Sequence, residues 1–93
     1  MMRSKYRSQA GIVYDILKTI KELGKAPPTR IMYGANLPYD RLRAILRHLV
    51  EQGLIKEIRE ENRVYYTLTK KGFRTLELLE ETKRLLEELG LRF

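Results

Sequence analysis

The stretch MYGANLPYDRLRAILRHLVEQGL, residues 32–54, limits the possible folds more than any other part of the chain. It predicts the end of a short helix, a turn over Gly34 to Asn36, and a longer helix that restarts at Pro38, because proline fits a first helical turn. Gly53 ends this helix. Its apolar residues fall on one stripe: Leu42, Ile45, Leu46, Leu49 and Val50. Two helices joined by a tight, glycine-containing turn indicate a helix-turn-helix unit.

The sequence before this stretch predicts another helix and a break. Ser8 is expected to cap a first helix that Gly24 ends. The apolar residues of this helix have helical spacing: Ile12, Val13, Ile16, Leu17, Ile20 and Leu23. Two prolines in Lys25 to Pro28 favour a linker or a very short edge strand. Thr29 is then expected to cap the short helix.

The sequence after this stretch predicts a β-hairpin and a last helix. Two β-prone runs, Leu54 to Ile58 and Val64 to Leu68, are joined by the polar segment Arg59 to Arg63. Thr69 is expected to cap a helix that continues to about Leu89. The fold class is therefore mainly α with a small β-hairpin (α+β), a winged helix-turn-helix with a long C-terminal coiled-coil helix. We expect a basic arm at residues 1–7, one domain at residues 8–75 and a dimerisation segment at residues 76–93.

Charge is unevenly distributed along the chain. Residues 1–50 hold ten Lys or Arg against three Asp or Glu, whereas residues 51–93 hold nine of each, so the net charge of +7 lies in the first half. A strongly basic half of this kind is expected of a protein that binds a polyanion such as a nucleic acid. The alternative is a generally basic surface with no such partner. Cysteine is absent, which favours a reducing, intracellular setting. The sequence has no apolar run long enough for a signal peptide or a membrane span, so we expect neither.

The exposed side of the longer predicted helix offers groups for base edges and phosphates. Arginine suits both, since its planar guanidinium binds guanine or phosphate through two hydrogen bonds. The candidates for DNA contact on or near this helix are Arg30, Tyr39, Arg41, Arg43, Arg47 and His48. On a helical projection Arg43 lies on one shoulder, and Arg41 and His48 lie on the other. The alternatives are a solvated basic face and, for Tyr39, packing against the short helix.

Basic residues of the hairpin and of the last helix are further candidates for DNA contact. Arg59 and Arg63 flank two glutamates that repel phosphate, so we expect Arg63 to contribute and the tip to approach the minor groove only shallowly. Lys70, Lys71 and Arg74 oppose the dipole at the start of the last helix, at a cost of about 0.3 to 1 kcal/mol each. This unfavourable placement suggests a phosphate contact, with tolerated surface residues as the alternative.

The last helix carries two apolar stripes, more than one small domain can cover. Phe73, Leu76 and Leu79 are expected to close the core. The second stripe is expected to protrude and pair with a second copy of the chain through Leu78, Thr82, Leu85, Leu86 and Leu89. The alternative is a single amphipathic helix that folds back on the domain. Its charged residues allow pairs between antiparallel helices: Glu80, Glu81, Glu87 and Glu88 against Lys83 and Arg84.

Two segments carry a family resemblance. TRIMYGANLPYDRLRAILRHLVEQGLI, residues 29–55, and YYTLTKKG, residues 65–72, resemble archaeal winged helix-turn-helix DNA-binding proteins. The resemblance extends from about Gly11 to Leu89. It implies a homodimer joined by an antiparallel coiled coil of C-terminal helices, with two heads that bind double-stranded DNA as chromatin-associated architectural proteins or as transcription regulators. Pro38 departs from the pattern, because the family usually has a capping serine there.

The sequence as a whole predicts a homodimeric, double-stranded DNA-binding transcriptional regulator, with the longer helix in the major groove and the hairpin near the backbone or the minor groove. An architectural chromatin protein without strong sequence preference and a winged-helix protein-interaction module are the alternatives. RNA binding is less favoured, because no aromatic platform for unpaired bases is apparent. The sequence contains no recognisable set of catalytic residues, so we do not expect an enzyme. We expect no cofactor, metal, membrane or identifiable small-molecule ligand, and a cytoplasmic, nucleoid-associated protein.

Overall fold

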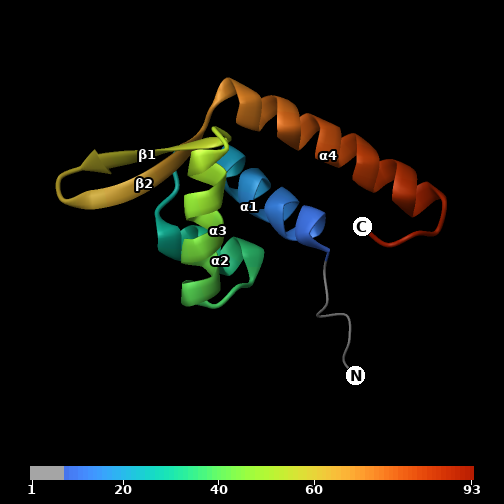
Figure 1. The fold of residues 1–93 in the computed structure, drawn as a ribbon, viewed down its shortest axis with the longest axis horizontal. Helices are drawn as coiled ribbons and strands as arrows, with labels where there is room; N and C mark the ends of the chain where they lie inside the picture. The colour runs from blue at the N-terminus through green and yellow to red at the C-terminus, as the bar shows by residue number, and fades with distance from the viewer. Residues whose placement is uncertain (1–7) are drawn as a thin grey trace.

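The computed structural model describes residues 8–93, which form four helices and one hairpin (Figure 1). The elements are α1 (Gln9–Leu23), α2 (Pro28–Ala35), α3 (Tyr39–Glu51), β1 (Ile55–Glu60), β2 (Arg63–Leu68) and α4 (Lys70–Glu88). This order confirms the predicted mainly α fold with a small hairpin. The predicted basic arm, residues 1–7, lies outside the described residues. Within residues 8–93, no helix is both long enough and apolar enough to cross a membrane.

Side chains cap the beginnings of α1 and α4. The Ser8 hydroxyl accepts a hydrogen bond from the Gly11 N–H, with 3.0 Å between nitrogen and oxygen. The Thr69 hydroxyl accepts one from the Gly72 N–H at the same distance of 3.0 Å. Gly24 ends α1 with a φ of 77°, a conformation that glycine adopts at little cost. The predicted ends of α1 and the predicted start of α4 are therefore confirmed.

The helix-turn-helix unit is confirmed, but its caps differ from the prediction. α2 begins at Pro28 and its N-cap is Pro27, so the predicted cap at Thr29 is wrong. Proline is favoured at the first helical position, because the N–H that it lacks would have had no partner there. Asn36 ends α2 in the left-handed conformation, with a φ of 55°. Pro38 is the extended N-cap of α3 and precedes the first helical residue.

The hairpin is longer than the sequence predicted. β1 and β2 pair antiparallel along their full length, and Glu60 lies opposite Arg63 at the tip. The predicted five-residue connection over Arg59 to Arg63 is therefore wrong. The connection consists of Glu61 and Asn62, which have φ values of 50° and 66°. A two-residue turn with positive φ at both positions matches the twist of a β-hairpin.

The segment between α1 and α2 holds the hairpin in place. Ala26 and Tyr66 exchange two backbone hydrogen bonds, of 2.9 and 2.8 Å. The Thr67 hydroxyl donates to the Gly24 carbonyl at 2.9 Å. Lys25 Nζ lies 2.6 Å from a Glu60 carboxylate oxygen. Between the two predicted alternatives, a linker or a very short edge strand, the structure has a linker with a one-residue β-bridge at Ala26, which fastens the hairpin to the segment between α1 and α2.

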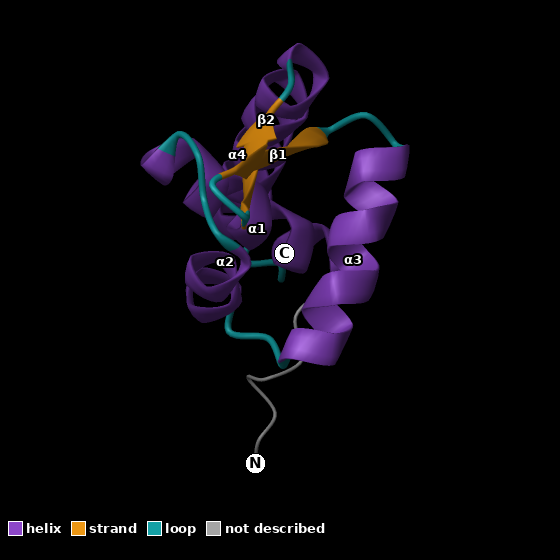
Figure 2. Ribbon diagram, turned by 90° about the vertical axis from the view of Figure 1, so that its left-hand side faces the viewer, coloured by secondary structure: helices purple, strands orange, loops and turns teal. Residues whose placement is uncertain are grey.

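The core surrounds α1, which α2, α4 and β2 contact. Figure 2 shows α3 along one side of the molecule, across from α2. Three leucines of the predicted apolar stripe of α3, Leu42, Leu46 and Leu49, are buried. Ile45 is partly buried, but Val50 is 37% exposed, so its predicted place on the buried stripe is wrong. The fully buried large side chains of the core are Ile16, Leu17, Ile20, Ile31, Leu42, Ile55 and Leu76.

The inner face of α4 packs along α1. Leu76 is only 1% exposed, and Leu79 packs against the core. Phe73 is 48% exposed, so its predicted place in the core is wrong. Its side chain lies about 60° around the helix from Leu76. The buried position of the first turn is instead Gly72, where a Cβ atom would collide with the Leu54 carbonyl.

The outer face of α4 is apolar and exposed, as predicted for Leu78, Leu85 and Leu89. Leu86 is half-buried, so the prediction that it protrudes is wrong. After α4 the chain turns back toward α1 (Figure 1), and the Phe93 ring meets the Tyr14 ring edge-on with 5.7 Å between centroids. The domain therefore covers one stripe of α4 and leaves the other uncovered.

Candidate nucleic-acid interface

A cleft of about 320 Å³ lies between α3 and the hairpin. Tyr39, Arg43 and Arg47 line it from α3, and Arg59 and Tyr66 line it from the hairpin. Four of these five residues are predicted DNA contacts, drawn from two separate parts of the sequence. Their common location is the main feature of this surface.

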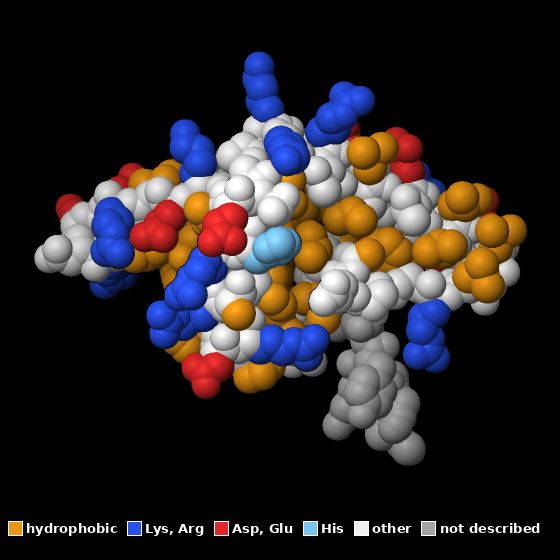
Figure 3. All heavy atoms as spheres, viewed as in Figure 1, with side chains coloured by type: hydrophobic (Ala, Val, Ile, Leu, Met, Phe, Trp, Pro, Cys, Tyr) orange, Lys and Arg blue, Asp and Glu red, His pale blue; other side chains and the backbone are white. Residues whose placement is uncertain are grey.

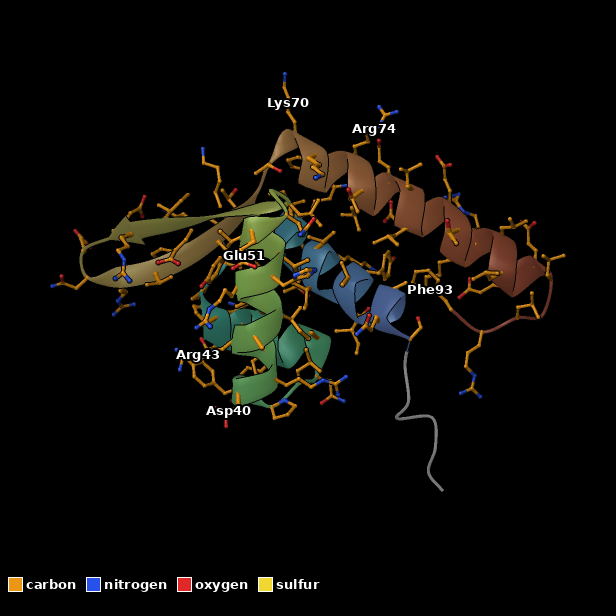
Figure 4. The ribbon with its side chains drawn as sticks, viewed as in Figure 1. Asp40, Arg43, Glu51, Lys70, Arg74 and Phe93 are labelled. Atoms are coloured by element: carbon orange, nitrogen blue, oxygen red, sulfur yellow. The ribbon has the colours of Figure 1, made fainter. Side chains whose placement is uncertain are left out.

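The anchored leucines of α3 determine which of its side chains reach the cleft. Because the buried leucines recur at helical spacing, Arg43 and Arg47 point away from the core one turn apart. Both are exposed, and Figure 4 shows Arg43 on the outer side of the helix. The Arg43 guanidinium carbon lies 5.9 Å from the centroid of the Tyr39 ring. Neither arginine forms an ion pair within residues 8–93.

Tyr66 on β2 also lines the cleft. Burial raises the pKa of its hydroxyl above the ordinary value, and the nearby Glu57 carboxylate and Tyr39 raise it further. Arg59 and Arg43 act on this pKa in the opposite direction. The hydroxyl therefore stays protonated at neutral pH and is available as a hydrogen-bond donor.

Carboxylates are also present in the cleft. Glu51 lines it at the end of α3, and Glu57 lines it from β1. Arg59 lies 3.4 Å from Glu57, and the two side chains are 72% and 39% exposed. An exposed ion pair contributes at most about 1 kcal/mol, so Arg59 can exchange its carboxylate for another anion at little cost.

The hairpin residues Glu57, Val64 and Tyr66 were missed as site residues by sequence reasoning. The strand register places Glu57 directly opposite Tyr66, and Val64 lies two positions away on the same face of the hairpin. The alternation in RVYYTL was the available signal. It could not identify the cleft without the packing of the hairpin beside α3.

Other predicted contacts lie elsewhere on the molecule. Arg41 and His48 line a second groove, on the opposite side of α3, which agrees with their predicted shoulder. Arg30 lies on α2 in a hollow that Thr19 and Tyr33 also line. Arg63 is exposed beside the hairpin tip.

The basic residues at the start of α4 differ in their contacts. Lys71 Nζ donates a hydrogen bond of 2.8 Å to the carbonyl of Gln52, the residue that caps the end of α3. Lys70 and Arg74 project outward from the first turns of α4, on the far side from Arg43 (Figure 4). Lys71 therefore helps to secure α3, while Lys70 and Arg74 lie outside the cleft between α3 and the hairpin.

Figure 3 shows how side chains of different kinds gather on one face. Lys and Arg side chains lie over the region of α3 and at the start of α4, whereas hydrophobic side chains run across the middle toward the far end of α4. In the described part of the chain, no group of three or more His, Cys, Asp or Glu residues is placed to hold a metal ion.

Comparison with known proteins is consistent with this architecture. A family model described as winged helix-turn-helix matches residues 6–87. The uncharacterized protein MJ0290 of Methanocaldococcus jannaschii is 40% identical over 82 residues, which cover 86% of this chain but only 36% of that relative. The chain thus spans about a third of the length of this curated relative.

Two solved structures of Sulfolobus solfataricus proteins are similar in fold. Sso10a-2, described as a DNA-binding protein, aligns with a TM-score of 0.82 and 31% identity over 89% of this chain and 85% of its own. The transcriptional regulator BldR aligns with a TM-score of 0.74 and 22% identity over 84% of this chain and 58% of its own. The second likeness concerns the fold alone.

Proposed function

The chain belongs to the winged helix-turn-helix family, and we propose that it binds double-stranded DNA with α3 in the major groove. The observation that carries the proposal is the exposure of basic and aromatic side chains on the outer side of α3. Tyr39, Arg43 and Arg47 are exposed there, and the two arginines are unpaired within the described residues. Buried leucines fix the opposite face. The major groove is wide enough to admit one helix, and Sso10a-2, similar over most of this chain, is described as a DNA-binding protein.

The hairpin acts as the wing in this proposal, with Arg59 and Arg63 near the phosphate backbone or the minor groove. Lys25 pairs with Glu60 at 2.6 Å and also lies 5.1 Å from the centroid of the Tyr65 ring. Hydrogen bonding to Glu60 raises the pKa of Lys25, so the ammonium persists at neutral pH and offsets one acidic charge of the tip. Repulsion between the wing and phosphate is correspondingly reduced.

We propose a transcriptional regulator in preference to an architectural chromatin protein. Glu51 and Glu57 lie in the same cleft as the arginines. A carboxylate repels phosphate at any sequence, but it can accept a hydrogen bond from the amino group of cytosine, while arginine favours guanine. A mixed cleft of this kind favours discrimination between base pairs over uniform binding. A DNA partner would place the protein in the nucleoid.

We further propose that the protein is a homodimer joined through α4. Leu78, Leu85 and Leu89 are more than half exposed, although leucine side chains of one stripe are normally covered. The first half of α4 is mainly basic and its second half mainly acidic, so antiparallel pairing brings opposite charges together and parallel pairing brings like charges together. Light scattering on the purified protein tests this, with an expected mass of twice the 11.1 kDa chain.

The test of DNA binding is a fluorescence-anisotropy titration of a random-sequence duplex of about 30 base pairs, at several salt concentrations, since each neutralised phosphate adds about 0.9 to the log-log slope. We expect a slope on the order of several phosphates. Repeated selection from a random pool then separates the two roles, because a regulator enriches a common sequence and an architectural protein does not. Absence of binding at low salt would overturn the proposal and favour the protein-interaction module.

A further inference from the structure

The second groove, on the far side of α3 from the hairpin, has a volume of about 460 Å³ and lies between α3 and α1. Its apolar lining comes from three parts of the chain: Ile12, Val13, Ala44, Ile45, Leu49 and Leu54. Arg41 and His48 also line it, and none of its lining residues within 8–93 is an Asp or Glu. The cleft between α3 and the hairpin, in contrast, is lined by two glutamates, Glu51 and Glu57. The second groove therefore fits an apolar group that is accompanied by negative charge.

The far end of α4 has the complementary composition. Leu85, Leu89 and Leu91 are each more than half exposed there, and we call these three residues the leucine knob. Glu88 lies next to Leu89, is exposed, and forms no ion pair within residues 8–93. The knob thus combines apolar side chains with an available carboxylate, and the exposed Arg92 follows Leu91.

The chain after α4 holds the leucine knob in a defined position. Gly90 adopts a positive φ of 74°, and the Leu91 N–H donates to the Leu86 carbonyl at 2.7 Å, as in a helix-terminating turn. Phe93 packs edge-on against Tyr14, which is itself buried on α1. With Leu86 and Phe93 turned inward, Leu91 is directed outward. A fixed apolar group loses less conformational entropy on binding than a mobile one.

The arrangement of the two surfaces fits an antiparallel dimer. The Leu54 carbonyl abuts Gly72 at the start of α4, and Leu54 also lines the groove, so the groove opens beside the first turn of α4. Antiparallel pairing of two α4 helices carries the end of one helix to the start of the other. Figure 3 shows hydrophobic side chains continuing across this face from beside α3 to the end of α4.

We propose that the leucine knob of one copy docks in the groove between α1 and α3 of a second copy. Two-fold symmetry then fills both grooves at once, because each copy donates a knob and receives one. Glu88 of the partner subunit approaches the rim formed by Arg41 and His48. α3 would thereby carry its DNA contacts on one flank and a contact from the second copy on the other, so dimer formation restrains the recognition helix. This inference rests on the homodimer proposed above.

Crosslinking between single-cysteine variants tests the docking directly, since the chain has no cysteine of its own. Ala44→Cys, exposed on α3 in the groove, is mixed with Leu91→Cys that carries a mass tag, and a short bismaleimide is added after subunit exchange. The matched control replaces Ala44→Cys by Tyr33→Cys, which is exposed on α2 and lies outside the groove lining. Only one cysteine per copy is present, so every mixed product joins two copies.

We expect a heterodimer band at least several-fold stronger for the Ala44 and Leu91 pair than for the control pair. Equal bands, in a sample that light scattering shows to be dimeric, would overturn the docking and leave the homodimer intact. A monomeric wild-type protein would overturn both the homodimer and the docking. DNA binding is measured independently of all three results.

Discussion

α3 and α4 both pack on the core through an apolar face, but their outer sides differ in chemistry. Each is amphipathic and fixes an apolar face on the core, through Leu42, Leu46 and Leu49 in α3 and through Leu76 in α4. The outer side of α3 carries arginines, whereas that of α4 carries leucines and is flanked by charges of both signs. The attachment explains the fold, and the outer residues support the two partners proposed above, DNA for α3 and a second copy of the chain for α4.

The two faces of α4 provide the largest expected difference. Leu76→Ala removes a side chain that is 1% exposed and should lower the free energy of unfolding by about 2 to 5 kcal/mol. Leu78→Ala removes an exposed one and should lower it by less than about 1 kcal/mol at concentrations where the chain is monomeric. Chemical denaturation followed by circular dichroism measures both. Equal losses would mean that the outer stripe is covered within one copy.

Leu85→Glu separates the roles of the two helices. It places a carboxylate in the second half of α4, in both the proposed α4 interface and the leucine knob, where an unpaired charge costs several kcal/mol, so the dimer should weaken by about 100-fold or more. Light scattering should then give the monomer mass, while the circular dichroism spectrum stays unchanged. Arg30→Glu introduces the same group on α2 and should leave the mass unchanged. If Leu85→Glu remains dimeric, the copies associate through another surface.

Tyr39 gives the smallest effect, because its ring contacts the Arg43 guanidinium and we propose that it only positions this arginine. The cation–π contact at 5.9 Å is exposed and worth about 0.5 to 1 kcal/mol. Tyr39→Ala should therefore weaken duplex binding by about 2- to 5-fold, and Tyr39→Phe, which keeps the ring, should not. A loss in Tyr39→Phe as large as that in Tyr39→Ala would assign the role to the hydroxyl and not to the ring.

Features that depend on local backbone chemistry were predictable from the sequence. Ser8 and Thr69 cap their helices as expected, Gly24 ends α1, and the three leucines of the apolar stripe of α3 are buried. Thr29 failed as a cap because the two preceding prolines start α2 two residues earlier, with Pro27 as the N-cap and Pro28 as the first helical residue. The two-residue hairpin turn could not be predicted, because Glu61 adopts a positive φ, a conformation that is uncommon for glutamate.

Features that depend on how separate elements meet could not be predicted from the sequence. The helical projection of α3 correctly separated Arg43 from Arg41 and His48, but it gave no information on which flank the hairpin would occupy. The Phe73 error has the same origin, because Leu54, the residue before β1, packs against Gly72, so that Gly72 and not Phe73 is the buried position of the first turn. Lys71 has a partner, Gln52, that no local pattern indicates.

The central claim is that the flank of α3 beside the hairpin contacts DNA phosphates or bases, and the salt dependence of an Arg43→Ala/Arg47→Ala double variant tests it most directly. The matched control is Arg92→Ala, an exposed arginine in the tail after α4, at the opposite end of the molecule from the hairpin (Figure 1). If both arginines of α3 neutralise phosphates, the log-log slope of anisotropy titrations should fall by about 1.8 relative to the wild type, while the control keeps the wild-type slope. A shallower fall with lost sequence preference would indicate base contacts. A double variant that binds every duplex like the wild type at all salt concentrations would contradict the account.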